Sequence, residues 1–133
     1  MNNSDIKILL VDDEPDILEI VGYNLKNEGY KVYTSTNGIE AVKSAKKIMP
    51  DLILLDIMMP EMDGIEACEK IRTIKNLENT LIVFLTARNE DYSKVAGFDA
   101  GADDYITKPI KPKVLVSKVK SLLRRLKGKN ETD

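Results

Sequence analysis

The sequence predicts an α/β fold, a doubly wound sandwich with helices on both faces of a parallel five-stranded sheet. Five short segments are almost continuously apolar and rich in β-branched or aromatic residues, at positions 6–11, 30–34, 52–55, 81–85 and 105–106. Because these segments do not alternate apolar with polar residues, most of them are expected to be strands buried on both faces. A stretch with helical period follows each strand, and this alternation indicates right-handed crossovers.

The first two helices have clear start and stop signals. The first is expected to begin at Pro15, with acidic residues in its first turn, and to end before Gly29, which suits a C-cap. The second is expected to begin at Gly38 and to end at Pro50. Apolar residues recur at helical spacing in both, namely Ile17, Val21 and Leu25 in the first and Ala41, Val42, Ala45 and Ile48 in the second.

Three further helices follow the third, fourth and fifth strands. One begins after Asp63, and its three-residue apolar steps at Ile65, Cys68 and Ile71 place the cysteine in the core. Another is expected at about 89–100, where the apolar pattern is short and mixed. The last follows Pro112 and has the clearest apolar stripe, formed by Leu115, Val119, Leu122 and Leu126.

The 133 residues fit one domain, which we expect to occupy residues 1–127, with a polar tail or the start of a linker at 128–133. The formal net charge of -2 gives no electrostatic reason to expect nucleic-acid binding. The first residues lack the features of a secretory signal, and the apolar runs fall well short of the roughly 20 residues of a membrane helix. A cytoplasmic location without membrane contact is therefore expected.

The available chemistry is restricted to carboxylates, hydroxyls and lysines. Histidine is absent and Cys68 is the single cysteine, so Ser-His and Cys-His nucleophiles, His-ligated zinc and internal disulfides are excluded. Asp12 and Asp13 follow the first strand and Asp56 follows the third, and the carboxyl ends of parallel strands meet at one edge of the sheet. Clustered carboxylates repel one another unless a cation is present, and oxygen ligands beside a phosphate suit Mg²⁺.

Each of these acids taken alone could be a helix cap or a charge that compensates the helix dipole. The set is harder to explain by packing, because Thr86 and Lys108 also follow strands and should lie at the same edge. A carboxylate nucleophile surrounded by a cation, an ammonium and a hydroxyl supports phosphoryl transfer to Asp56. In that reaction Lys108 and the Thr86 hydroxyl would stabilise the phosphoryl oxygens.

Five groups of residues carry a resemblance to a known family: Asp12-Asp13-Glu14, Leu55-Asp56-Ile57-Met58-Met59-Pro60, Met62-Asp63-Gly64, Thr86-Ala87 and Lys108-Pro109. With these motifs the chain resembles the receiver (CheY-like) domain of bacterial two-component response regulators, over about 6–126. The resemblance implies a flavodoxin-like fold with strand order 2-1-3-4-5. It also implies a phosphoacceptor switch that assists its own phosphorylation and dephosphorylation, and not an enzyme.

The resemblance assigns a role to each site residue. Asp56 would be the phosphoacceptor, charged by the phosphohistidine of a sensor histidine kinase. The Mg²⁺ ligands would be Asp13, Asp56, the Met58 carbonyl and, through water, Asp12. Thr86 and Tyr105 would form the switch, in which the hydroxyl moves toward the phosphoryl group and the aromatic ring turns inward. Tyr105 could instead be an ordinary amphipathic residue at a sheet edge.

The stretch at 101–109 and the closing Leu122-Leu123-Arg124-Arg125 are similar to the OmpR/PhoB subfamily of transcription factors, which carries a winged-helix output domain. Its receivers form homodimers through the fourth helix, fifth strand and fifth helix. Residues at or near such positions here are Lys94, Asp103, Asp104, Lys118 and Arg124. Val114 replaces an acid usual in that interface, and Ile110 replaces a phenylalanine. These charges could also be a solvated face.

Three other functions compete with a transcription-factor receiver. A Mg²⁺-dependent phosphatase of the dehalogenase-like kind needs a second acid two residues beyond Asp56, where Met58 stands. A flavin- or nucleotide-binding module needs a phosphate loop in place of the acids after the first strand. A stand-alone receiver that acts by protein contact stays open, beside a regulator whose output domain is absent from this chain.

The resemblance further implies that Met58 and Arg88 tune the phosphoryl lifetime, and that Lys108-Pro109 is a cis bond.

Overall fold

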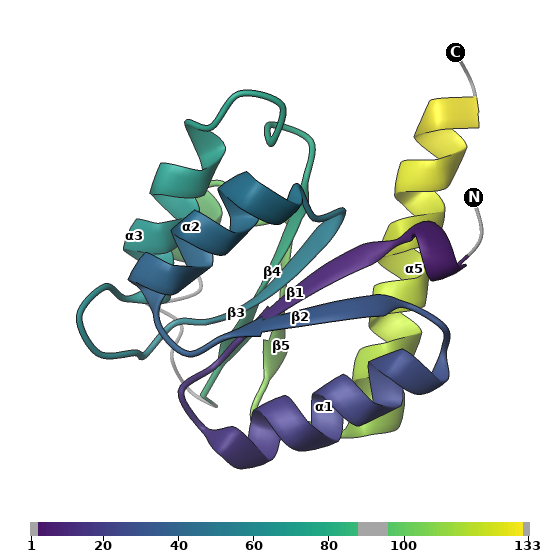
Figure 1. Ribbon diagram of the computed structural model, residues 1–133, viewed down its shortest axis with the longest axis horizontal. Coiled ribbons are helices and arrows are strands. Elements are labelled where there is room, and N and C mark those ends of the chain that lie inside the picture. Colours follow the sequence, from purple (N-terminus) through teal and green to yellow (C-terminus); the bar gives the residue numbers. More distant parts are fainter. Residues whose placement is uncertain (1–2, 88–95, 132–133) are drawn as a thin grey trace.

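The computed structural model describes residues 3–87 and 96–131, with side chains described through residue 126. Its centre is one parallel sheet with the order β2-β1-β3-β4-β5, as the sequence predicts (Figure 1). The strands are β1 (Lys7–Val11), β2 (Lys31–Ser35), β3 (Leu52–Asp56), β4 (Leu81–Thr86) and β5 (Asp104–Thr107). Each begins and ends within two residues of its predicted bounds, because apolar content marks buried strands well.

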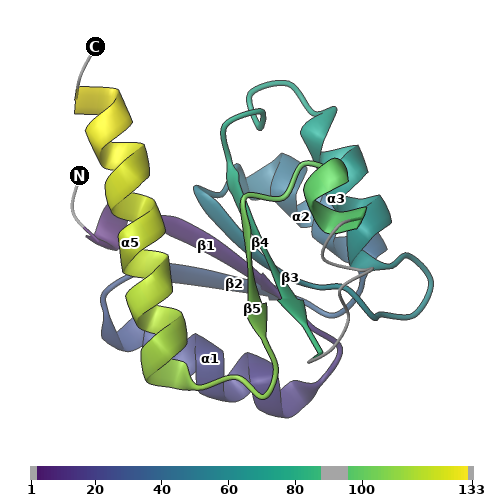
Figure 2. The same ribbon diagram turned by 180° about the vertical axis from the view of Figure 1, so that it is seen from behind.

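Helices cover both faces of the sheet, which makes a three-layer sandwich. They are α1 (Pro15–Asn27), α2 (Gly38–Ile48), α3 (Gly64–Arg72) and α5 (Pro112–Glu131), after a short 3-10 turn, η1 (Asn3–Asp5). α1 and α5 lie on one face, and α2 and α3 lie on the other (Figures 1 and 2). Of the helix predicted at 89–100, the structure describes a short helical segment at 96–99 that ends in a turn at 100, and 89–95 lie outside the described residues.

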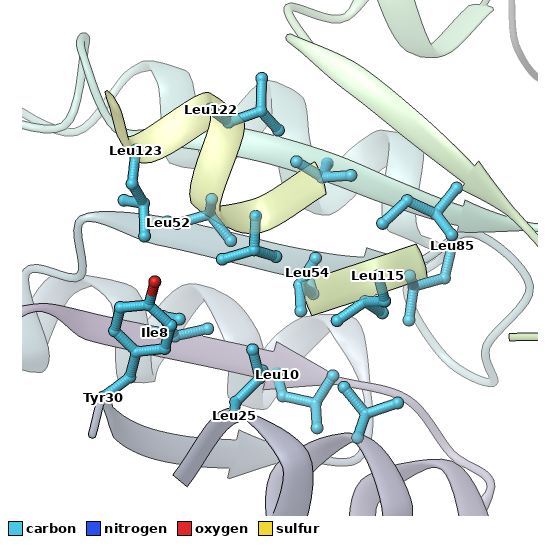
Figure 3. Packing of buried hydrophobic residues seen from close by; sticks show 14 of the residues in the cluster. Ile8, Leu10, Leu25, Tyr30, Leu52, Leu54, Leu85, Leu115, Leu122 and Leu123 are labelled. Carbon is cyan, nitrogen blue, oxygen red and sulfur yellow. The ribbon is translucent and has the colours of Figure 1, made fainter. Parts of the chain in front are cut away.

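The central strands are buried on both faces, so successive residues contribute to two separate cores. Ile8 and Leu10 pack with α1 and α5 in one core, near Leu115 and Leu122 (Figure 3). Val119 of the predicted stripe belongs to the same core, whereas Leu126 is only partly buried. The other core lies under α2 and α3, and it contains the fully buried Cys68 as predicted. β2 and β5 are less buried than the predicted pattern suggests, because they form the two edges of the sheet.

Local signals account for the helix ends. The Asn37 and Asp63 side chains cap α2 and α3 by accepting hydrogen bonds from the Glu40 and Glu66 backbone N-H groups, each at 2.9 Å. α1 ends before Gly29, whose φ of 97° suits glycine, as predicted. α5 continues to Glu131, beyond the point where the apolar periodicity ends. Among the helices of the described part of the chain, none is long and apolar enough to cross a membrane.

Candidate functional site

Three carboxylates meet at the carboxyl edge of the sheet. Asp12 follows β1 and is fully buried, Asp56 is the last residue of β3 and is also buried, and Asp13 is exposed. The register pairs Val11 with Leu55 across the two neighbouring strands, so both strands end at the same level. One carboxylate oxygen from each acid lies within 4.8 Å of the others. The parallel pairing of β1 and β3 therefore creates the cluster, as their sequence positions led us to expect.

Lys108 is the cation of this cluster. Its Nζ atom lies 3.0 Å from Glu14 Oε1, 3.2 Å from Asp12 Oδ2 and 3.5 Å from Asp56 Oδ1. Burial alone would lower the pKa of Lys108, but the hydrogen bond with Glu14 and the negative charges of Asp56 and Asp12 raise it above its ordinary value. The ammonium therefore stays charged throughout the physiological pH range.

A single ammonium does not offset the cost of gathering these acids. Burial, followed by repulsion from Asp12, raises the pKa of Asp56 from 3.8 to about 7, even though Lys108 acts in the opposite direction. The buried Oδ2 of Asp12 has no hydrogen-bond partner among the described residues, although it lies 3.2 Å from the Lys108 ammonium as an ion pair. Its other oxygen accepts a hydrogen bond from the Glu14 backbone at 2.9 Å. The site is thus short of positive charge.

This donor set fits Mg²⁺. The three acids offer oxygen ligands only, one of them a buried oxygen without a hydrogen bond, and a hard cation prefers such ligands. The two buried aspartates need a counter-charge that Lys108 alone does not supply, since it is shared with Glu14. Asp12, Asp13 and Asp56 are therefore the side chains that could hold the ion.

The remaining residues expected at this edge lie on β4 and β5. Thr86 is the last residue of β4 and is buried, and its carbonyl accepts a 2.6 Å hydrogen bond from the Lys108 backbone N-H. This bond joins the ends of β4 and β5 beside the cluster. The Thr86 hydroxyl donates to the Ala87 carbonyl at 3.4 Å. The Lys108-Pro109 bond is cis, as predicted, and Arg88 lies outside the described residues.

The structure adds residues that the sequence did not single out. Glu14 belongs to the Asp12-Asp13-Glu14 motif, but the sequence assigned it no role at the site, whereas in the structure it makes the shortest ion pair of Lys108. Its place directly after Asp12-Asp13 was the signal available. Tyr105 is partly buried, and its ring meets Phe98 edge to face, with centroids 5.8 Å apart and planes at 71°. The aromatic partner of the predicted switch residue is therefore Phe98 from the segment before β5.

The residues proposed for a dimer face differ in their environments. The Asp103 carboxylate accepts hydrogen bonds from Ile82 N at 2.8 Å and from Arg72 Nη2 at 2.9 Å, so it is engaged within the molecule. Asp104 and Lys118 form an ion pair at 3.6 Å. Arg124 is exposed on α5, and Lys94 lies outside the described residues. Val114, which replaces the usual acid, is 55% exposed.

Comparisons with known proteins agree on one family. Residues 8–120 match the family described as response regulator receiver domain. The chain is 48% identical over 119 residues to the alkaline phosphatase synthesis transcriptional regulatory protein PhoP of Bacillus subtilis strain 168, covering 90% of this chain and 49% of the relative. It thus spans about half the length of that curated relative.

The chain is also similar to solved structures of response regulators. A receiver domain protein (CheY-like) from Methanospirillum hungatei JF-1 has a TM-score of 0.87 at 31% identity, covering 93% of this chain and 98% of that one. The chemotaxis response regulator CheY4 of Vibrio cholerae has a TM-score of 0.83 at 33% identity, covering 87% and 97% of the two chains. Both similarities therefore extend over most of this chain.

Proposed function

The chain belongs to the family of response regulator receiver domains of two-component systems, and from this premise we propose that Asp56 is its phosphoacceptor, in a site that binds Mg²⁺. The observation that carries the proposal is the position of Lys108, which lies 3.5 Å from Asp56 and 3.2 Å from Asp12 at a buried carboxylate cluster. A structural cap would need neither the ammonium nor the second buried acid. A site that neutralises a phosphoryl group needs both positive charge and a metal-binding carboxylate.

Each residue of the site has its own role in phosphoryl transfer to Asp56. An oxygen of Asp56 attacks phosphorus in line, the bond from phosphorus to the donor's histidine nitrogen breaks, and the leaving imidazole takes up a proton. Lys108 turns from its carboxylate partners toward one phosphoryl oxygen, and the Thr86 hydroxyl donates to another. Asp13, Asp56 and the Met58 carbonyl would hold Mg²⁺, with Asp12 as a ligand through water, and the bound ion would supply the remaining positive charge.

Phosphorylation then changes a surface away from the site. We propose that Thr86 moves toward the phosphoryl group and that Tyr105 turns inward from its contact with Phe98, which alters the face formed by β5, α5 and the segment before β5. The phosphorylation state of Asp56 thereby controls the two alternative positions of Thr86 and Tyr105. The protein acts as a switch that assists its own phosphorylation and dephosphorylation, and it is not proposed to turn over a separate substrate.

The partners follow from the family and from the relatives. The phosphoryl donor is a sensor histidine kinase, and the reaction takes place in the cytoplasm, where ATP charges such kinases. Because this chain spans about half of a transcriptional regulator to which it is 48% identical, we propose that it controls transcription through an output domain outside this chain. The receiver itself does not contact DNA. A stand-alone receiver acting by protein contact is the alternative.

We also propose that the phosphorylated receiver forms a homodimer through the face that includes β5 and α5. Lys118, Asp104 and Arg124 supply charges there, whereas Asp103 is already engaged with Arg72. Exposed Val114 supplies an apolar contact where the subfamily usually has an ion pair. Lys94 is assigned to the same face by its place in the sequence.

The proposal is tested by incubating the protein with Mg²⁺ and acetyl phosphate, followed by intact mass measurement and size-exclusion chromatography. The wild type should gain one phosphoryl group only when Mg²⁺ is present, and Asp56→Asn should gain none. Beryllofluoride should shift the wild type to a dimer. A dimer favours the transcription regulator, whereas a monomer that still binds the mimic favours the stand-alone receiver. Failure of the wild type to take up phosphate or mimic would refute the assignment of Asp56.

A further inference from the structure

The loop at 57–63, which joins β3 to α3, is a compact unit beside the phosphoacceptor. It begins directly after Asp56 and carries Met58, whose carbonyl is a proposed metal ligand. Two backbone hydrogen bonds close it, from Gly64 N to the Ile57 carbonyl and from Met62 N to the Pro60 carbonyl, each at 2.8 Å. Because these bonds link both ends of the loop, a displacement at residue 62 is transmitted toward residues 57–60.

Gly38, the first residue of α2, presses against this loop from a distant part of the sequence. A Cβ atom at position 38 would lie 2.3 Å from the Met62 carbonyl oxygen and 2.9 Å from Met62 Cβ. The described glycines with positive φ are Gly29 and Gly101, so the backbone conformation of Gly38 does not itself require glycine. The requirement at Gly38 is for space, because the loop backbone occupies the place where a side chain would begin.

We propose that Gly38 is a positioning residue for the phosphoacceptor site, where its missing side chain lets the loop at 57–63 lie close enough to α2 to present the Met58 carbonyl to Mg²⁺. This inference rests on the proposed function of Asp56. Real Cβ atoms essentially never approach other atoms within 3.0 Å, so Gly38→Ala must open the 2.3 Å gap by 0.7 Å or more. Metal and catalytic sites need their groups held within about 0.5 Å.

The loop is the part that gives way, because α2 is held on its other sides. The Asn37 side chain caps the helix by accepting from Glu40 N, and Ala41 and Ala45 are fully buried against the sheet. Much of the loop faces solvent and Met58 is 67% exposed, although Ile57 is buried and Met59 and Met62 pack partly against the core under α2 and α3. Moving α2 would displace fully buried residues, whereas moving residues 58–62 of the loop outward displaces side chains that are half-buried or exposed. A methyl group at position 38 therefore displaces the metal-binding side of the site.

Gly22 provides a matched control. It lies within α1, and a Cβ atom there would meet no atom within 4 Å. Gly38→Ala and Gly22→Ala thus add the same methyl group to a helical glycine, with and without the obstruction. Mg²⁺ affinity is measured by isothermal titration calorimetry, and hydrogen exchange of the peptide at 57–63 is followed by mass spectrometry. The phosphorylation rate is measured with acetyl phosphate.

Gly38→Ala should weaken Mg²⁺ binding by about 10-fold to 100-fold, speed exchange at 57–63 and slow phosphorylation, because a displacement near 1 Å can cost that much. Gly22→Ala should match the wild type in all three. A folded Gly38→Ala protein with wild-type Mg²⁺ affinity and wild-type exchange would overturn the proposal. A wild type that binds Mg²⁺ but takes up no phosphoryl group would refute the proposed function alone.

A second variant tests the same contact if Gly38→Ala does not fold. Met62→Gly keeps the Met62 carbonyl and Gly38 in place but removes the Met62 side chain, which lies beside Gly38 and packs against the core under α2 and α3. The loop then loses its support, so Mg²⁺ binding should weaken and exchange at 57–63 should rise. Wild-type values for both in Met62→Gly would overturn the proposal as well.

Discussion

Replacing Asp56 by asparagine should stabilise the metal-free protein, although it removes the proposed phosphoacceptor. The wild-type carboxylate is buried beside Asp12, which raises its pKa to about 7. Above that pH the folded protein carries an ionised group in an unfavourable position. An asparagine has nearly the same shape and no charge, so the penalty disappears in the variant.

The size of the effect follows from the pKa. The folded value of about 7 lies roughly three pKa units above the ordinary value of 3.8, and each unit corresponds to about 1.36 kcal/mol. The upper limit is therefore about 4 kcal/mol. Between these two pKa values the folded state binds more protons than the unfolded state, so wild-type stability falls as pH rises from about 4 to about 7. The advantage of Asp56→Asn should be near zero at pH 4 and greatest above pH 7.

The assay is urea denaturation in EDTA at pH 5, 6, 7 and 8, with the free energy of unfolding taken from the linear extrapolation. Glu19→Gln is a control, because it removes one exposed negative charge from α1, away from the site. The control should differ from the wild type by less than about 0.5 kcal/mol at every pH. Added Mg²⁺ stabilises whichever protein binds it, because the ion binds only the folded state. The wild type should be stabilised more than Asp56→Asn, which lacks one of the proposed carboxylate ligands.

Two results would refute this reasoning. If Asp56→Asn were as stable as the wild type at pH 8 in EDTA, burial and the charge of Asp12 would not destabilise the ionised Asp56 carboxylate in the folded protein. If the variant were more stable by the same amount at pH 5 and pH 8, the gain would not arise from ionisation of Asp56.

Three further predictions concern other parts of the molecule. Lys108→Ala should lower the rate of phosphorylation by acetyl phosphate by about 10-fold or more, because the site loses the ammonium that neutralises a phosphoryl oxygen; an unchanged rate would contradict that role. Arg72→Ala should lower the free energy of unfolding by about 2–4 kcal/mol in urea titrations, since Asp103 and several loop carbonyls lose a charged donor; a loss under 0.5 kcal/mol would contradict it. Substituting both Met58 and Arg88 should change the phosphoryl half-life in a filter assay, and an unchanged half-life would show that these positions do not control water access.

Much of the fold is predictable because its signals are local. Apolar runs mark the buried central strands, and glycine or capping residues such as Asn37 and Asp63 mark the helix ends. Parallel pairing places the ends of β1 and β3 at one edge, so the meeting of Asp12 and Asp56 could be expected before any coordinates. For the edge strands β2 and β5 the bounds were predictable but the burial was less so, although both are more polar than the central strands, because the place of a strand in the sheet decides what covers it.

Sequence alone determined the strands, most of the helices and the residues that meet at the carboxyl edge, because periodicity and chain order carry that information. Tertiary structure alone decided which of these residues share partners. Lys108 pairs with Glu14 across 94 positions, and Asp103 is engaged by Arg72. Gly38 touches the loop at Met62. Such contacts depend on how helices and loops pack over the sheet, and close packing sets them to fractions of an ångström that no local pattern records.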